Sequence, residues 1–418
     1  MSDVTPQADL ELTPHPELPE VDVAGNRVQL FVESPEYVAA LVADMRAARK
    51  RIWIESYIVA DDHVGHVLAE ELKERARAGI ACRLMYDAVG SLATPGSFMT
   101  ELQAAGVEVF AYRTMSSMLF RYRFFQRFNR RNHRKLVVID DEISYFGGMN
   151  FADPGSSVRP SKRQQSEAAD VVDEATVPDA PARSDDAKYW RDLHVRMVGP
   201  RTAEIAELVD TLWNRVHDRP HRSRKPPSLS KFLASKEDGF YFFDAHPRLR
   251  YHRAARLFRR VIDRASRRVT LAMAYFIPTG TVLRSMLRAR KKGVPVRAVV
   301  PGVSDVPAVQ WAGRHMYDSL LRHGIDVYER QERMLHSKVM VVDDLYTVCG
   351  SCNIDPRSLL TNLEFIAIIR SRAVAEQVEA VWLFERSHSV PVRLGDGEKL
   401  PWWRRKLNAI AWFFRRWL

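Results

Sequence analysis

The chain has 418 residues, 46% of them hydrophobic and 28% charged, so it is long enough for two globular domains and too apolar to be disordered throughout. Its 63 basic and 52 acidic side chains, with a pI near 9.6, favour anionic partners such as phospholipid surfaces, nucleic acid or phosphate esters. The three cysteines are too few for a disulfide framework or a four-ligand zinc site, which indicates a reducing compartment.

The first half of the chain begins with an acidic, proline-rich stretch. Residues 1–25 lack both a basic start and an apolar core, so we expect a disordered tail rather than a signal peptide. From about Asn26, strands and helices alternate, and this alternation predicts an α/β fold with a largely buried sheet. The expected strands are 28–31, 52–57 and 81–86, and the expected helices are 37–49 and 63–78.

The same order of elements returns in the second half, with helices expected at 252–267 and 281–292 and strands at 269–275 and 295–300. The joint 77–80 is answered by 291–294, and in each joint a glycine stands where a helix C-cap requires a left-handed residue. Residues 106–110 are answered in the same way by 324–328. The sequence therefore predicts two tandem copies of one α/β unit, over residues 26–217 and 239–392.

Two segments interrupt the repeat. Residues 218–238 are basic and proline-rich at their start, which predicts an extended linker between the two copies. Inside the first copy, residues 154–188 are rich in Ser, Ala, Asp and Pro and have little apolar pattern. We expect this second segment to be a mobile insertion.

Each copy carries the motif His-x-Lys-x4-Asp. The members are His133, Lys135 and Asp140, with Asn150 downstream, and His336, Lys338 and Asp343, with Ser351 and Asn353 downstream. A His and a Lys at i and i+2 lie on one face of a strand and can present an imidazole and an ammonium group to one phosphate. Phosphoryl transfer through a covalent intermediate needs a nucleophile, an acid for the leaving oxygen and cations for the other oxygens. Two His–Lys pairs supply all of these without a metal.

Two simpler interpretations compete with this chemistry. A single His-x-Lys at a strand end is more often a solvated pair, but its repetition in register favours a shared site. A zinc site is disfavoured because lysine is a poor ligand and the spacing matches no zinc pattern. We therefore expect neither a metal nor another cofactor.

The doubled motif resembles the signature of the phospholipase D superfamily, and the resemblance covers roughly residues 26–390. It implies two phospholipase D-like α/β repeats, packed as a pseudo-twofold pair with one active site at their interface. In that family one histidine becomes phosphorylated by the substrate's phosphatidyl group, and the other protonates the departing alcohol. The resemblance also implies that the motif aspartates, Asp140 and Asp343, lie farther from the phosphate and support the site.

Carboxylates that orient the histidines are expected downstream of each motif. The stretch 353–364 looks like the family segment that returns a carboxylate to a histidine ring, which makes Glu364 the candidate. In the first copy, residues 190–194 are similar to a motif common in cardiolipin synthases, which makes Asp192 the candidate. An alignment of the following helices, Ala203 against Ala373, instead sets His194 opposite Glu364, so the role of His194 stays open. Gly148 stands where the second copy has Ser351, so the two halves are not equivalent.

Two further segments suit a membrane. Within residues 393–418, aromatic and aliphatic side chains at helical spacing oppose a basic face, as in helices that bind anionic bilayers; docking on the protein itself is the alternative. Trp412 falls on the basic face and does not fit this pattern. Residues 118–131 interleave aromatics with arginines, which fits base stacking, a lipid headgroup boundary or a buried edge.

The residues 55–57, 61–62, Gly79 and Asp87 fit the pattern of bacterial cardiolipin synthases that lack N-terminal spanning helices. The resemblance thus implies transfer of a phosphatidyl group from one phosphatidylglycerol to the hydroxyl of another, with release of glycerol. It also implies peripheral attachment to the bacterial inner membrane, on the cytoplasmic face by the cysteine usage. The alternatives are a phospholipase D that forms phosphatidic acid and a nuclease; the aromatic C-terminal helix disfavours the nuclease, and no nucleic acid partner is expected.

Overall fold

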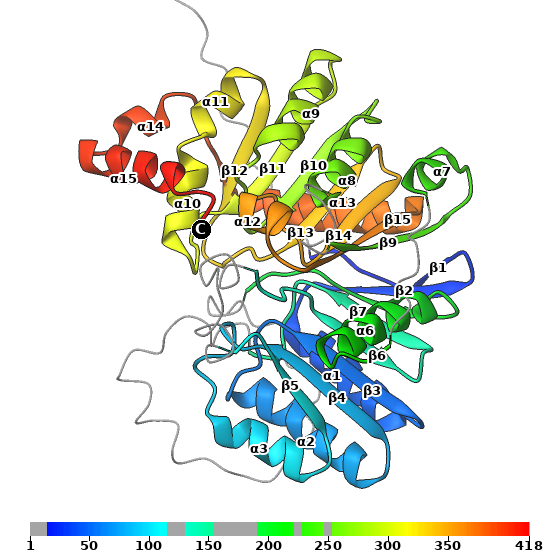
Figure 1. Ribbon diagram of the computed structural model, residues 1–418. Helices are drawn as coiled ribbons and strands as arrows, with labels where there is room; N and C mark the ends of the chain where they lie inside the picture. The colour runs from blue at the N-terminus through cyan, green and yellow to red at the C-terminus, as the bar shows by residue number, and fades with distance from the viewer. Residues whose placement is uncertain (1–14, 115–129, 154–189, 221–227, 246–252, 418) are drawn as a thin grey trace, which may run out of the picture.

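The computed structural model describes residues 15–114, 130–153, 190–220, 228–245 and 253–417 (Figure 1). Residues 1–14 of the expected tail, the insertion over 154–188, most of the segment 118–131 and the central part of the linker lie outside the described residues.

The first half of the chain forms one mixed sheet of eight strands in the order β1-β2-β8-β7-β6-β3-β4-β5. The strands β3, β4 and β5 at one side of the sheet are parallel, and parallel neighbours need crossover connections, which here contain helices. The strands are β1 (Val21–Val23), β2 (Asn26–Phe31), β3 (Arg51–Ser56), β4 (Ala81–Asp87), β5 (Glu108–Tyr112), β6 (Leu136–Ile139), β7 (Ile143–Gly147) and β8 (His194–Val198). The helices are α1 (Ser34–Ala47), α2 (His63–Arg77), α3 (Gly96–Ala104) and α6 (Thr202–Val216).

The second half repeats this plan with the sheet order β16-β12-β11-β10-β13-β14-β15-β9. The strands are β9 (Gly239–Ala245), β10 (Val269–Met273), β11 (Val296–Pro301), β12 (Ile325–Arg330), β13 (Lys338–Val342), β14 (Tyr346–Gly350), β15 (Glu364–Arg370) and β16 (Ser389–Pro391). The helices are α7 (Leu229–Ala234), α8 (Arg253–Ile262), α9 (Gly280–Lys291), α10 (Pro307–Arg314), α11 (Tyr317–Arg322), α12 (Pro356–Leu360), α13 (Arg372–Ser387), α14 (Asp396–Lys399) and α15 (Trp402–Phe413). The predicted α/β fold with two repeats is confirmed.

The predicted N-terminal tail is wrong for its last residues. Val21–Val23 form β1, which pairs with β2, because Val23 is buried among apolar side chains of the sheet. His15 also has a fixed neighbour, since its Nε2 lies 3.2 Å from Nη1 of Arg191. The helix α7 lies within the stretch 218–238 that was expected to be an extended linker.

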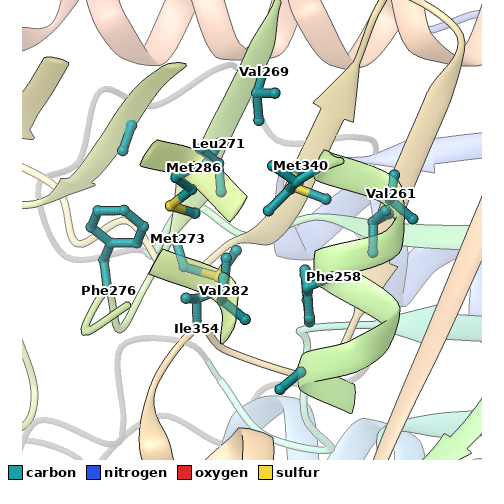
Figure 2. Close-up of a cluster of buried hydrophobic side chains, with 14 of the residues drawn as sticks. Phe258, Val261, Val269, Leu271, Met273, Phe276, Val282, Met286, Met340 and Ile354 are labelled. Atoms are coloured by element: carbon teal, nitrogen blue, oxygen red, sulfur yellow. The ribbon is translucent and has the colours of Figure 1, made fainter. Parts of the chain in front are cut away.

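Each half has its own core, and a third core joins the two. Figure 2 shows part of the core of the second half, where Phe258, Met286 and Met340 pack together. A separate cluster contains residues of both sheets, and within it the rings of Phe146 and Phe365 lie 5.4 Å apart. The two halves therefore share buried apolar surface and form one packed unit.

The sheet register fixes which residues of the two halves correspond. The motif histidines are 336 − 133 = 203 positions apart, which sets Gly147 opposite Gly350. Gly147 pairs with His194, and Gly350 pairs with Ile366, so the strands that follow are offset by 366 − 194 = 172. At that offset Asp192 corresponds to Glu364, and His194 does not.

The helix alignment that set His194 opposite Glu364 was therefore wrong by two residues. It used an offset of 373 − 203 = 170, whereas the strands require 172. The reason is a difference in the loops. Residues 199–201 connect β8 to α6, but residue 371 alone connects β15 to α13.

Candidate active site

The two motifs lie at equivalent edges of the two sheets. Leu136 of β6 pairs with Glu55 near the carboxyl end of β3, and Lys338 of β13 pairs with Met273 at the carboxyl end of β10. His133 and His336 precede these strands, so both lie beyond the carboxyl ends of parallel strands. This is the edge of an α/β sheet at which ligands usually bind.

Backbone from the opposite half holds each histidine. The His133 amide donates to the Leu363 carbonyl oxygen at 2.9 Å, and the His336 amide donates to the Arg191 carbonyl oxygen at 2.6 Å. Isolated parallel bridges join Asn132 to Leu363 and Arg191 to Leu335. The two segments that carry the histidines are therefore fixed at the seam between the halves.

The carboxylates that contact the two histidines also come from the opposite halves. Nδ1 of His133 lies 3.1 Å from Oε2 of Glu364, and Nδ1 of His336 lies 2.6 Å from Oδ2 of Asp192. Each histidine thus takes its carboxylate from the other half. Nδ1 of His133 also lies 3.0 Å from the Ser351 carbonyl oxygen. Because both neighbours only accept, this Nδ1 carries the proton and Nε2 keeps its lone pair.

Nδ1 of His336 has both a carboxylate and an ammonium group as neighbours. Oδ2 of Asp192 accepts from Nδ1 of His336, and Nζ of Lys338 lies 2.8 Å from the same Nδ1. Nζ of Lys338 is also 3.7 Å from Oδ2 of Asp192. Nζ of Lys135 donates to the carbonyl oxygen of His133 at 2.9 Å.

Burial shapes the charge states of this cluster. Burial lowers the pKa of His133 to about 4, and burial together with the charge of Lys338 lowers the pKa of Lys135 to about 7. Burial and the charge of Lys338 also lower the pKa of His336. Although burial opposes it, the charges of Lys338 and His336 hold the pKa of Asp192 below its ordinary value. At neutral pH the His133 imidazole is therefore neutral and the Asp192 carboxylate is ionised.

The difference between Gly148 and Ser351 has a geometric reason. The Ser351 hydroxyl donates to Oε2 of Glu364 at 2.5 Å. A Cβ on Gly148 would lie 2.0 Å from Oδ1 of Asp192, so the Asp192 carboxylate fills the space that a side chain would need. The serine therefore supports the carboxylate of its own half, and glycine makes room for the carboxylate in the other.

The motif asparagines hold the loops that follow the central strands. Oδ1 of Asn150 accepts from the Ile58 amide at 3.2 Å, and Oδ1 of Asn353 accepts from the Tyr275 amide at 3.3 Å. The Nδ2 group of Asn353 is buried, and no described residue accepts from it.

The structure does not bring Asp140 or Asp343 to this cluster. They lie at the opposite ends of β6 and β13, where Asp140 accepts from the amides of residues 49–51 at 2.7 to 2.9 Å. Asp343 accepts from the amides of residues 266–268 at 2.7 to 3.1 Å. Both carboxylates therefore anchor the turn before the neighbouring strand.

His194 lies behind the site. Its Nδ1 accepts from the Met149 amide at 3.2 Å, and its ring centroid is 4.5 Å from that of Tyr37. Burial lowers its pKa to about 3. The imidazole therefore stays neutral and supports the segment that contains Gly148.

Aromatic neighbours of the histidines were not predicted as site residues. The Tyr57 ring lies 5.0 Å from the His133 ring, and the Trp190 ring lies 4.8 Å from the His336 ring. Trp190, Asp192, Asn150 and His336 line one pocket. The position of Tyr57 directly after β3 was the available signal, because the motif lies at that edge of the sheet.

Among the described residues, no group of three or more His, Cys, Asp or Glu side chains is arranged to hold a metal ion. No helix within the same residues has the length and apolar character needed to cross a bilayer.

Comparison with known proteins gives consistent results. The family model described as "Cardiolipin synthase, PLD-like domain" matches residues 41–177 and 258–385. Cardiolipin synthase B of Salmonella typhi is 29% identical over 94% of this chain and 88% of its own, and cardiolipin synthase A of Pseudomonas syringae is 31% identical over 86% and 68%. The crystal structure of phosphatidylserine synthase from Haemophilus influenzae shares the fold, with a TM-score of 0.65 and 15% identity over 94% of this chain and 95% of that one.

Proposed function

Because the chain belongs to the cardiolipin synthase, PLD-like domain family and is a phosphatidyltransferase of the phospholipase D superfamily, we propose that it joins two phosphatidylglycerol molecules into cardiolipin and releases glycerol. The observation that carries this proposal is the pair of His–carboxylate contacts at the seam between the halves. Two basic nitrogens, each oriented by a carboxylate, suit a transfer in two displacement steps.

In the first step, Nε2 of one motif histidine attacks the phosphorus of a phosphatidylglycerol. The N–P bond forms, the P–O bond to the headgroup glycerol breaks, and the other histidine gives a proton to the departing glycerol oxygen. The ammonium groups of Lys135 and Lys338 offset the charge on the non-bridging oxygens. The product of this step is a phosphatidyl-histidine.

In the second step, the histidine that lost its proton takes one from the hydroxyl of a second phosphatidylglycerol. The hydroxyl oxygen attacks the phosphorus, the N–P bond breaks, and cardiolipin leaves with the phosphatidyl group. The carboxylates of Glu364 and Asp192 stabilise whichever imidazole is charged at each stage. Both histidines return to their starting states.

The reaction is tested by incubating the purified protein with phosphatidylglycerol vesicles, without added metal, and measuring lipids and released alcohol by mass spectrometry. Cardiolipin together with equimolar glycerol is the expected result. Phosphatidic acid without cardiolipin would make the protein a hydrolase and would overturn the proposed acceptor. Cleavage of nucleic acid with no lipid product would overturn the proposal altogether.

We place the enzyme at the bacterial inner membrane, bound peripherally on the cytoplasmic face. The basic, aromatic helix α15 supports membrane attachment. Three free, buried cysteines, Cys82, Cys349 and Cys352, support a reducing compartment. Release of the protein from isolated membranes by high salt, without detergent, is the expected result of fractionation.

A further inference from the structure

The helix α15 docks on the protein through only one of its faces. It packs against α10, and on this face Asn408 and Ala411 are buried. The Trp412 ring stacks on His315 with centroids 5.7 Å apart. Trp412, which did not fit the expected apolar stripe, therefore belongs to the docked face.

The other face of α15 presents large apolar side chains to solvent. Trp402 is 64% exposed, Phe413 is 75% exposed, and Ile410 is more than half exposed. Basic groups lie directly beside the aromatic rings, with Nζ of Lys406 4.9 Å from the Trp402 centroid. Figure 1 shows α15 beside α10 at the edge of the second half. Docking within the chain thus leaves a basic, aromatic surface uncovered by any described residue.

Two loops beside the active site also expose aliphatic side chains. Leu92, which is 71% exposed, follows Gly90, whose position leaves no room for a Cβ beside the Tyr57 ring. The Tyr57 ring contacts His133. The first loop is therefore attached to the surroundings of one motif histidine.

The second loop follows β11 and is built in a comparable way. Val303, which is 60% exposed, lies two residues before Asp305, whose carboxylate accepts from the Tyr275 hydroxyl at 2.9 Å. The Tyr275 ring lies 6.5 Å from the His336 ring. The loop leads directly into α10, the helix on which α15 docks.

We propose that the free face of α15 and the two loops form one membrane-binding edge, defined by Leu92, Val303, Trp402, Ile410 and Phe413, which seats the carboxyl-end opening of the active site on an anionic bilayer. Aromatic and basic side chains together favour the headgroup region of such a bilayer. Because both loops join the surroundings of the motif histidines, this contact would let a lipid headgroup reach the site from the membrane. The inference rests on the proposed function for its substrate but not for its test.

The test measures binding to vesicles of phosphatidylglycerol and phosphatidylcholine by flotation. The double variant Leu92→Ser/Val303→Ser and the double variant Trp402→Ser/Phe413→Ser are each expected to bind at least ~10-fold more weakly than the wild type. The matched control is Leu383→Ser/Val390→Ser, which removes two exposed aliphatic side chains from α13 and β16 and should bind like the wild type. Melting curves verify that all variants are folded. Deletion of α15 is unsuitable, because Ala411 belongs to a core cluster.

The outcomes separate this inference from the proposed reaction. If the loop variant binds vesicles as well as the wild type does, the loops do not touch the membrane and the inference is overturned. Both double variants should also keep their turnover on short-chain phosphatidylglycerol dissolved in detergent, where no bilayer has to be reached. A wild-type protein that binds anionic vesicles but forms no cardiolipin would refute the reaction and leave the membrane-binding edge standing.

Discussion

Neither His–carboxylate pair is contained within one half of the chain. His133 contacts Glu364, and His336 contacts Asp192, across the seam. The spacing of the motifs predicted the two histidines, and the resemblance to the family predicted the two carboxylates, but neither predicted which carboxylate serves which histidine. That choice depends on how the halves pack, and only the backbone contacts at Leu363 and Arg191 reveal it.

His133→Ala and His336→Ala are each expected to lower kcat by at least ~10³-fold, because a nucleophile and its partner acid act as one unit. The measurement is cardiolipin formation on phosphatidylglycerol vesicles. His323→Ala, at an exposed histidine, is the control and should keep full activity. Substantial turnover in either motif variant would refute a mechanism that needs both histidines.

Gly148→Ser would make the two motifs more alike, yet it is expected to reduce kcat by at least ~10²-fold. The new Cβ would collide with the Asp192 carboxylate and displace it from His336. Gly239→Ser is the control, because a Cβ there meets no atom within 4 Å. Wild-type kcat in Gly148→Ser would show that the position of Asp192 is not critical.

His194 makes stability sensitive to acid. In the folded protein the pKa of His194 is about 3, whereas in the unfolded chain the imidazole has its ordinary pKa of about 6.5. The contribution of neutral His194 to the free energy of unfolding is therefore present above pH 6.5 and is lost as the pH falls toward 3. Between pH 6.5 and 4.5 this loss is about 2 kcal/mol of unfolding free energy. In His194→Asn the side-chain oxygen can still accept from the Met149 amide. Urea titrations of this variant should show a loss of unfolding free energy between about pH 6.5 and 4.5 that is smaller by that amount than the loss in the wild type. Equal losses in both proteins would assign the acid sensitivity to other groups.

At the scale of elements, the sequence predicted the strands around the site well. The alternation of helices and strands located β3, β4, β10 and β11 to within about a residue at most ends, because buried parallel strands read as short apolar runs. An alignment of the helices alone could not show that Asp192 and Glu364 occupy equivalent positions in the two halves. A loop that is two residues longer before α6 shifts that alignment, and only the strand register reveals the shift.

The motif aspartates hold the turns that precede the neighbouring strands and lie outside the histidine cluster. Asp140→Ala should lower the unfolding free energy by about 2 to 4 kcal/mol, because it removes three amide contacts and leaves alanine at a φ of 53°. The folded protein should keep a kcat within about twofold of wild type. Asp140→Asn retains an acceptor and tolerates this φ, so its loss should be smaller. A stable Asp140→Ala protein without activity would return Asp140 to the catalytic group.

At the scale of the whole molecule, buried ion pairs tie the halves together. The fully buried Arg134 guanidinium contacts Glu55 in its own half and Asp244, at 3.1 Å, in the other. Arg191 contacts Glu385 of the second half at 2.8 Å. Together with the shared aromatic core, these contacts predict that both halves unfold together.

Arg134→Ala should therefore lower the unfolding free energy by about 3 to 5 kcal/mol, because it leaves the buried Glu55 carboxylate without its partner. Calorimetry should show one transition, moved to lower temperature. Arg288→Ala breaks a half-exposed pair with Asp263 and should cost less than about 1 kcal/mol. Two separate transitions in the Arg134 variant, one of them unchanged, would mean that the halves are energetically independent.

The exchange of carboxylates across the seam also limits how this enzyme can be recombined. A chimera that takes one whole half from a distant relative joins His133 to a foreign partner at position 364, and His336 to a foreign partner at position 192. Both His–carboxylate contacts then join a residue of this chain to a residue of the relative. A crossover that keeps residues 190–194 with the second motif, and residues 362–364 with the first, preserves both pairs. A recombined chain therefore keeps both His–carboxylate pairs when its crossovers respect these contacts, and loses them when it is joined at the boundary between the repeats.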